Sequence, residues 1–213
     1  MRSVLCFGLL GAAAYLLGAI PTGYLAAKSR WIDIRKVGSG NIGATNVYRT
    51  MGRKWGIGVF AGDALKGFVP AFLFPIAARW WGCDGGPLLA VVCAAGAVAG
   101  HNWPVYLGFK GGKGVATSAG GLLGVAPAAG GIGLAVWVVF FLLTRYVSLA
   151  SLAAAVGVSI SGWFLYRREG LLLPVALTVL GVVLIVRHRS NIRRLWEGKE
   201  LRAGGKGREG GRI

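Results

Sequence analysis

The sequence predicts an all-α integral membrane protein with about seven transmembrane helices. Hydrophobic residues make up 55% of its 213 residues, whereas charged residues make up only 15%. Long apolar runs without charge recur along the chain, and about 20 such residues span the hydrocarbon core of a bilayer as a helix. The 37 glycines are typical of closely packed membrane helices. We therefore expect one transmembrane domain over residues 1–202.

The apolar runs divide into seven expected crossings, with six or five as the main alternatives. The first run has 25 uncharged residues, which is too long for the apolar part of a signal peptide, about 7–15 residues. The fourth and fifth are short, and could be tilted, partly buried in protein or a single hairpin. The expected segments are Ser3–Ala27 (bent at Pro21), roughly Trp55–Ala78, Gly86–Trp103, Lys113–Ala126, about Gly131–Thr144, Val147–Tyr166 and Leu171–Val186.

The distribution of positive charge predicts the orientation. The formal net charge is +17, which often indicates nucleic-acid binding. Here the cations instead cluster at the ends of apolar runs, as the positive-inside rule expects, so we expect no nucleic-acid partner. Seven cations fall in residues 28–54 and nine after Val186. We therefore expect an outside N-terminus, a cytoplasmic C-terminus and a disordered basic tail over residues 203–213.

The cysteines and acids argue against several chemistries. Cys6, Cys83 and Cys93 are scattered without metal-ligand spacing, and we expect neither a disulfide framework nor thioester chemistry. The seven acids form no cluster in the sequence that could hold Mg²⁺. We therefore expect no metal and no cofactor.

Residues 38–49 carry the first candidate anion site. The stretch from Gly38 to Gly43 matches G-x-G-x-x-G, but no βαβ unit surrounds it, so a dinucleotide site is excluded. Small residues let the backbone fold around an anion, and hydroxyl, amide and guanidinium groups can donate to it. The alternative is a flexible loop with basic anchors. The expected ligand-binding residues are Ser39, Gly40, Asn41, Thr45, Asn46 and Arg49.

Residues 110–117 carry the second candidate. This Lys-Gly-Gly-Lys-Gly turn resembles a P-loop only superficially, because Gly rather than Ser or Thr follows its second lysine. Two glycines beside two ammonium groups still suit an anion. The alternative is a positive-inside anchor that starts a helix. The expected residues are Lys110, Gly111, Gly112, Lys113 and Thr117.

Polar residues at expected helix ends complete the set. His101 could act as a general base, a phosphate donor or a structural residue. Asp63 and Lys66 lie three apart within an apolar run, so they should pair or face a polar cavity in support of the site. Two further pairs, each three residues apart, are Arg145 with Ser148 and His188 with Asn191. For these pairs the alternatives to ligand binding are helix capping and compensation of the helix dipole.

Together these blocks resemble the membrane-integral acyl-phosphate:glycerol-3-phosphate acyltransferases of bacteria. The resemblance runs in order through residues 38–49, 63–67, 100–117, 145–148 and 188–195 and covers nearly the whole chain. It implies seven helices in the bacterial inner membrane and transfer of a fatty acyl group from acyl phosphate to the sn-1 hydroxyl of glycerol 3-phosphate. The products are 1-acyl-glycerol 3-phosphate and phosphate, in phospholipid biosynthesis.

We expect roles for these residues on that basis. His101, Lys113 and Asn41 are the expected catalytic residues, and the others bind the two phosphorylated substrates, with membrane lipids as further partners. Whether His101 or a substrate phosphate takes the hydroxyl proton stays open. The rival interpretation is a transporter of phosphate esters, which would place its anion site near the bilayer midplane. A non-catalytic scaffold is disfavoured because it needs no such donor-rich loops.

Overall fold

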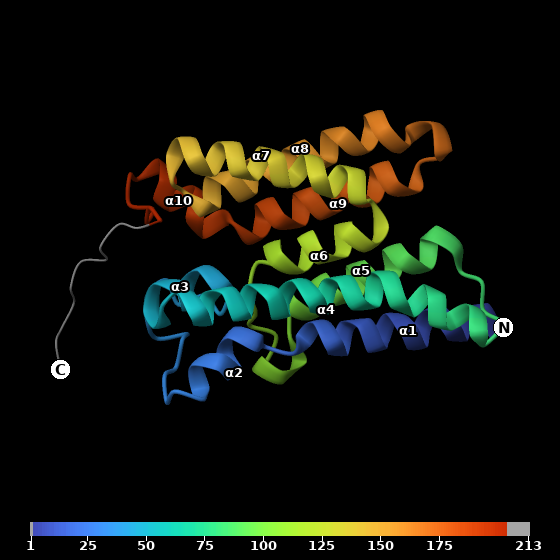
Figure 1. The fold of residues 1–213 in the computed structure, drawn as a ribbon, viewed down its shortest axis with the longest axis horizontal. Coiled ribbons are helices and arrows are strands. Elements are labelled where there is room, and N and C mark those ends of the chain that lie inside the picture. Colours follow the sequence, from blue (N-terminus) through green and yellow to red (C-terminus); the bar gives the residue numbers. More distant parts are fainter. Residues whose placement is uncertain (1, 204–213) are drawn as a thin grey trace.

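The computed structural model describes residues 2–203, and every regular element in that range is helical (Figure 1). The α-helices are α1 (Arg2–Ala19), α2 (Thr22–Lys28), α3 (Ala44–Met51), α4 (Arg53–Trp80), α5 (Gly86–Asn102), α6 (Val115–Val125), α7 (Pro127–Thr144), α8 (Val147–Tyr166), α9 (Leu172–Arg187) and α10 (Arg189–Trp196). Two 3₁₀ turns, η1 (Val105–Leu107) and η2 (Arg167–Glu169), complete the set. The predicted all-α class is confirmed.

The expected crossings appear as helices, with two differences. Five segments are long and apolar enough to span a membrane, and α9 with α10 forms a sixth, bent by 57°. The fourth segment, α6, has only 11 residues, too few to span alone. The fifth is longer than expected, because α7 begins at Pro127 and has 18 residues. Proline is favoured at the first position of a helix, because an N–H group there would have no hydrogen-bond acceptor within the helix.

The expected bend at Pro21 is confirmed. Helix α1 ends at Ala19 and α2 begins at Thr22, because proline has no backbone N–H and its ring clashes with the preceding helical turn. The break leaves the carbonyl of Ile20 without its helical partner. Lys66 of α4 donates to this oxygen at 2.7 Å.

Close contacts through glycine hold the first group of helices together. A Cβ on Gly120 of α6 would lie 1.9 Å from the carbonyl oxygen of Ala64 in α4, and one on Gly67 would lie 2.0 Å from that of Thr117. The α1–α5 contact has the same basis at Gly18 and Gly100, whose Cβ atoms would each lie 2.1 Å from a carbonyl oxygen of the partner helix. Small residues permit such backbone approach in membranes. Helices α7, α8 and α9 form a second group on the other side of α6 (Figure 1).

The segments with candidate anion sites gather at one end of the molecule. Helices α2, α3 and α10 lie at this end, and the start of α1 lies at the other (Figure 1). Loops that are distant in the sequence therefore converge at this end. The expected tail over residues 203–213 lies outside the described residues except for Ala203, whose N–H donates to the carbonyl of Arg145 at 2.8 Å.

The expectation of no disulfide was wrong. Cys6 in α1 is bonded to Cys83 in the turn between α4 and α5, 77 positions away, while Cys93 is free and buried. Helix packing brings the start of α1 to the α4–α5 turn, and nothing in the spacing of the cysteines reveals this. The start of α1 and the α4–α5 turn lie at the end of the molecule away from α3 and α10 (Figure 1).

The glycine contact between α4 and α6 gives a stability prediction. We expect Gly120→Leu to lower the free energy of unfolding by about 1–3 kcal/mol or more, because the side chain would push the two backbones apart. Gly58→Leu in α4 is the control, since no atom lies within 4 Å of its Cβ position. Thermal unfolding in detergent would check this, and equal midpoints for the two variants would contradict it.

Candidate active site

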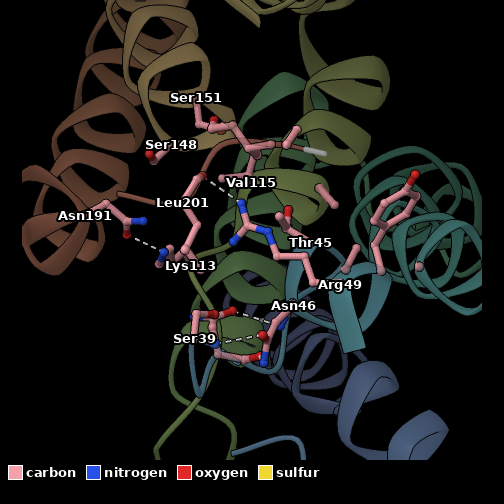
Figure 2. Close-up of a pocket in the computed structure, with 18 of the residues that line it drawn as sticks. Ser39, Thr45, Asn46, Arg49, Lys113, Val115, Ser148, Ser151, Asn191 and Leu201 are labelled. Atoms are coloured by element: carbon pink, nitrogen blue, oxygen red, sulfur yellow. Dashed lines mark hydrogen bonds between the residues drawn. The ribbon is translucent and has the colours of Figure 1, made fainter. Parts of the chain in front are cut away.

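A cavity of about 920 Å³ opens at the end where α3 and α10 lie. Its walls come from the loop before α3, from α3 and α4, from the end of α5, and from the turn that carries Lys113 with the start of α6. The end of α7, the start of α8, the α9–α10 corner, α10 and the chain after it complete the walls (Figure 2). Segments more than 150 residues apart therefore share one space. The predicted site residues on its wall are Ser39, Asn41, Thr45, Asn46, Arg49, His101, Lys113, Arg145, Ser148, His188 and Asn191.

Asn46 holds the first loop in shape. Its side-chain oxygen accepts from the backbone N–H of Ser39 at 2.8 Å, and its amide nitrogen donates to the carbonyls of Asn41 at 2.9 Å and Val37 at 3.0 Å. Gly38 has a φ of 60° and its Cβ would clash with this amide, so the turn requires glycine. Since these bonds occupy the amide, we reassign Asn46 from phosphate donor to support of the loop.

The Lys-Gly-Gly-Lys turn contributes one of its lysines. Lys113 reaches the cavity and donates to the side-chain oxygen of Asn191 (Figure 2). The two glycines instead hold the turn in place: Arg187 donates to the carbonyls of Gly111 at 3.2 Å and Gly112 at 2.6 Å. The N–H of Gly112 donates to the carbonyl of His101 at 3.0 Å.

Five predicted binding residues do not line this cavity. They are Gly40, Lys110, Gly111, Gly112 and Thr117. Lys110 is exposed outside the cavity, and Thr117 is fully buried where α6 meets α4. Residue type indicated an anion site at this turn, but only the fold decides which of its groups face the cavity.

Glu200, like Arg194 and Lys199, is a cavity residue that the sequence interpretation missed. Its side chain is 5% exposed and accepts from Ser148 at 2.8 Å, Asn191 at 2.6 Å and Arg194 at 2.7 Å. Burial opposes ionisation of this carboxyl, but the hydrogen bonds from Asn191, Ser148 and Arg194 outweigh it, and the pKa is lowered. The sequence offered one signal for this residue: Glu200 is an acid within a basic stretch, six residues after Arg194.

The chain after α10 crosses the mouth of the cavity. Arg49 donates to the carbonyl of Leu201 at 2.9 Å (Figure 2), and the guanidinium of Arg202 lies over the ring of Tyr146. This segment therefore links α3, the α7–α8 turn and α10. Its own carboxylate, Glu200, lies among cations and amides that could otherwise face an anion.

A buried charge network forms part of the cavity wall. Lys66 Nζ lies 2.9 Å from Asp63 Oδ1, which confirms the predicted pair. The hydroxyl of Thr22 donates to the same carboxylate oxygen, and His101 Nδ1 lies 3.5 Å from it. The other ring nitrogen of His101 faces Gly112, whose Cβ would lie 2.0 Å from Nε2. His101 is therefore packed between Asp63 and the Lys-Gly-Gly-Lys turn, at the wall of the cavity.

Electrostatics tune the lysine of the cavity. Burial is the main cause that lowers the pKa of Lys113 to about 8; Glu200 opposes this shift, and the positive charges of Arg194, Arg49 and Arg187 add to it. Near neutral pH this amine is charged, yet its environment disfavours the charge. A bound anion would stabilise the charged amine, because an opposite charge favours the protonated form.

The fold and the site define a helical membrane protein with a strongly basic cavity, and comparisons identify the family. The family model for glycerol-3-phosphate acyltransferase matches residues 8–198. The glycerol-3-phosphate acyltransferase of Geobacter sulfurreducens is 48% identical over 194 residues, covering 91% of this chain and 96% of that protein. The enzyme of Aquifex aeolicus is 46% identical over 191 residues, covering 89% and 95%. This chain therefore belongs to the glycerol-3-phosphate acyltransferase family and is an acyltransferase.

Solved structures support the same assignment. The crystal structure of PlsY (YgiH), an integral membrane glycerol 3-phosphate acyltransferase in its glycerol 3-phosphate form, has a TM-score of 0.82 and 43% identity, covering 93% of this chain and 96% of that one. Its lysophosphatidic acid form has a TM-score of 0.79 and 42% identity. The resemblance predicted from the sequence is confirmed, and with it an integral membrane enzyme of phospholipid biosynthesis.

Lys113 gives a pH prediction that sulfate can test, because the charge of sulfate is constant near neutral pH. We expect the affinity of the protein for sulfate to fall about tenfold as pH rises through about 8. The lysine then loses the charge that strengthens its hydrogen bond to the sulfate. Lys113→Arg should remove this pH dependence. Calorimetric titration in detergent would measure it, with Lys110→Gln as an unaffected control. If the wild-type protein bound sulfate with the same affinity at every pH from 7 to 9, the assignment would be contradicted.

Proposed function

We propose that this protein transfers a fatty acyl group from acyl phosphate to the sn-1 hydroxyl of glycerol 3-phosphate. The products are 1-acyl-glycerol 3-phosphate and inorganic phosphate. The reaction takes place at the cytoplasmic face of the bacterial inner membrane, where the positive-inside rule puts the basic loops around the cavity. The titles of the PlsY structures, which name glycerol 3-phosphate and lysophosphatidic acid forms, support the acceptor and the product.

The excess of positive charge around the cavity carries the proposal. Five Lys or Arg residues line it against two carboxylates, Asp63 and Glu200, and Asp63 is paired with Lys66. Such a surplus favours an anionic ligand, and phosphate suits guanidinium and ammonium donors. The five cations are Arg49, Lys113, Arg145, Arg194 and Lys199.

The chemistry needs orientation and charge stabilisation. The acyl phosphate is a mixed anhydride, so phosphate leaves readily without a covalent enzyme intermediate. The glycerol hydroxyl oxygen attacks the carbonyl carbon, a new ester bond forms, and the bond from that carbon to the phosphate oxygen breaks. Ser39, Asn41 and Thr45 bind one phosphate, while Arg49, Ser148 and His188 with Asn191 hold glycerol 3-phosphate. Lys113 faces the charge that develops on the departing phosphate.

The hydroxyl proton goes to a phosphate oxygen of the acyl donor. His101 is the alternative acceptor, but it is 5% exposed, with Nδ1 toward Asp63 and Nε2 against Gly112. A general base must reach the proton that it removes. We therefore assign His101 to positioning the Lys-Gly-Gly-Lys turn, through its ring and its carbonyl oxygen.

An assay of phosphate release tests the function directly. Purified protein in detergent is incubated with hexadecanoyl phosphate and glycerol 3-phosphate, and with hexadecanoyl-CoA in place of the acyl phosphate. We expect phosphate and lysophosphatidic acid only with the acyl phosphate, because the cavity offers two anion subsites beside an apolar wall. Transfer from the CoA ester alone would reject the proposed donor.

Replacing His101 distinguishes the two proton acceptors. We expect His101→Asn to retain kcat within about tenfold, because asparagine keeps a donor near Asp63 but cannot take a proton. Loss of a general base would cost about 10²–10⁴-fold. Thermal unfolding should accompany the kinetics, so that a destabilised variant is recognised. A loss beyond a hundredfold in a variant with wild-type stability would return His101 to the role of base.

A further inference from the structure

Arg187 is the last residue of α9, and its guanidinium reaches the Lys-Gly-Gly-Lys turn between α5 and α6. Nε donates to the carbonyl of Gly112 at 3.1 Å, and Nη2 donates to the carbonyls of Gly112 at 2.6 Å and Gly111 at 3.2 Å. The same guanidinium lies over a ring of Trp103, with Cζ 5.4 Å from the ring centroid. Two carbonyl acceptors and an aromatic face therefore fix both the position and the plane of this group.

The end of α5 holds the turn from the opposite side. The peptide group between Gly111 and Gly112 donates through its N–H to the carbonyl of His101 at 3.0 Å, while its own carbonyl accepts from Arg187. The carbonyl and the N–H of a trans peptide group point in opposite directions. A Cβ on Gly111 would lie 2.2 Å from the carbonyl oxygen of His101, so no larger residue fits here. This peptide group is therefore clamped between α5 and α9.

The clamp sets where Lys113 lies relative to the α9–α10 corner. Lys113 follows Gly112 directly, and its ammonium donates to Asn191 of α10 (Figure 2). Arg187 and Asn191 are four residues apart, so one corner of the chain binds both the backbone of the turn and the side chain of its second lysine. Arg187 does not line the cavity itself. It therefore acts on the cavity through the turn.

Arg187 also keeps its positive charge close to the cavity. No ion pair within residues 2–203 includes this residue, and carbonyls and an indole do not neutralise a guanidinium. Its charge acts on Lys113, because it is one of the causes that lower the pKa of that amine. Arg187 thus has two separable effects on Lys113, one through geometry and one through charge.

We propose that Arg187 is a positioning residue for acyl transfer, which holds the Lys-Gly-Gly-Lys turn so that the ammonium of Lys113 faces the departing phosphate. The reaction step in this proposal rests on the proposed function, whereas the placing of Lys113 as an anion ligand does not. Displacing a reacting or stabilising group by about 1 Å can cost about a hundredfold in rate. A lysine at position 187 would keep the charge but could not bond two carbonyls in the plane of a fork and stack on an indole.

The variant Arg187→Lys separates geometry from charge. We expect kcat with hexadecanoyl phosphate to fall at least about tenfold. The KM for glycerol 3-phosphate should stay within about threefold, because Arg49 and Ser148, which hold that substrate, lie outside the turn. Arg193→Lys is the matched control, since Arg193 is exposed, donates to Glu197 at 2.8 Å and lines no part of the cavity. A kcat for Arg187→Lys within about twofold of the wild-type value would overturn the proposal, whatever the KM.

Chemical rescue distinguishes positioning from a loss of structure. Arg187 is half-buried, so truncation to alanine leaves a site that a small solute can reach. We expect methylguanidinium to raise kcat of Arg187→Ala at least about threefold, because it restores the planar donor fork. Ethylammonium, which carries the same charge without the fork, should not. A misfolded variant would respond to neither solute. Recovery with neither, or equal recovery with both, would contradict the assigned role.

Sulfate binding separates this inference from the proposed function, because it needs no turnover. In calorimetric titrations at pH 7 we expect Arg187→Lys to bind sulfate at least about fivefold more weakly than the wild type, since Lys113 no longer holds its place. If the wild-type protein used no acyl phosphate, the proposed function would fail, and weaker sulfate binding by Arg187→Lys would still support the placing of Lys113. Equal sulfate affinities for Arg187→Lys and the wild type would overturn the inference even if hexadecanoyl phosphate is a good donor.

Discussion

Concentrated positive charge in a partly desolvated cavity is the constraint on which the site depends. Lys113, Arg194 and Arg49 come from three distant segments, and their mutual repulsion must be balanced in the folded protein. Glu200 supplies part of that balance through hydrogen bonds to Ser148, Asn191 and Arg194. Because one carboxylate cannot balance five cations, the site is prepared for an anionic substrate before one arrives.

The helices bring these charges together through unusually close backbone contacts. Gly67 and Gly120 let α4 and α6 approach until a Cβ at either position would overlap a carbonyl oxygen. This approach places the turn that carries Lys113 beside the end of α5. The second group of helices, α7–α9, then supplies Ser148 and the α9–α10 corner. The active site therefore lies where the two helix groups meet.

Residues that the sequence suggested for one task often perform a neighbouring one. Asn46, expected to donate to phosphate, holds the loop that carries Ser39 and Asn41. Gly111 and Gly112 were expected to bind an anion, but their carbonyls accept hydrogen bonds from Arg187, and Gly112 packs against His101. In each case the residue type was informative about the neighbourhood of the site. The partner that each group takes depends on contacts between segments far apart in the chain.

The sequence by itself determined the helical membrane fold, the position of most apolar segments and the loops that hold the candidate anion-binding groups. These follow from local properties: apolar run length, the backbone chemistry of proline and glycine, and the clustering of Lys and Arg. Tertiary structure alone decided that Glu200 enters the site, that Cys6 meets Cys83, and that Lys110 and Thr117 stay out of the cavity. Those outcomes depend on the direction of each side chain after distant helices have packed, which no short stretch of sequence encodes.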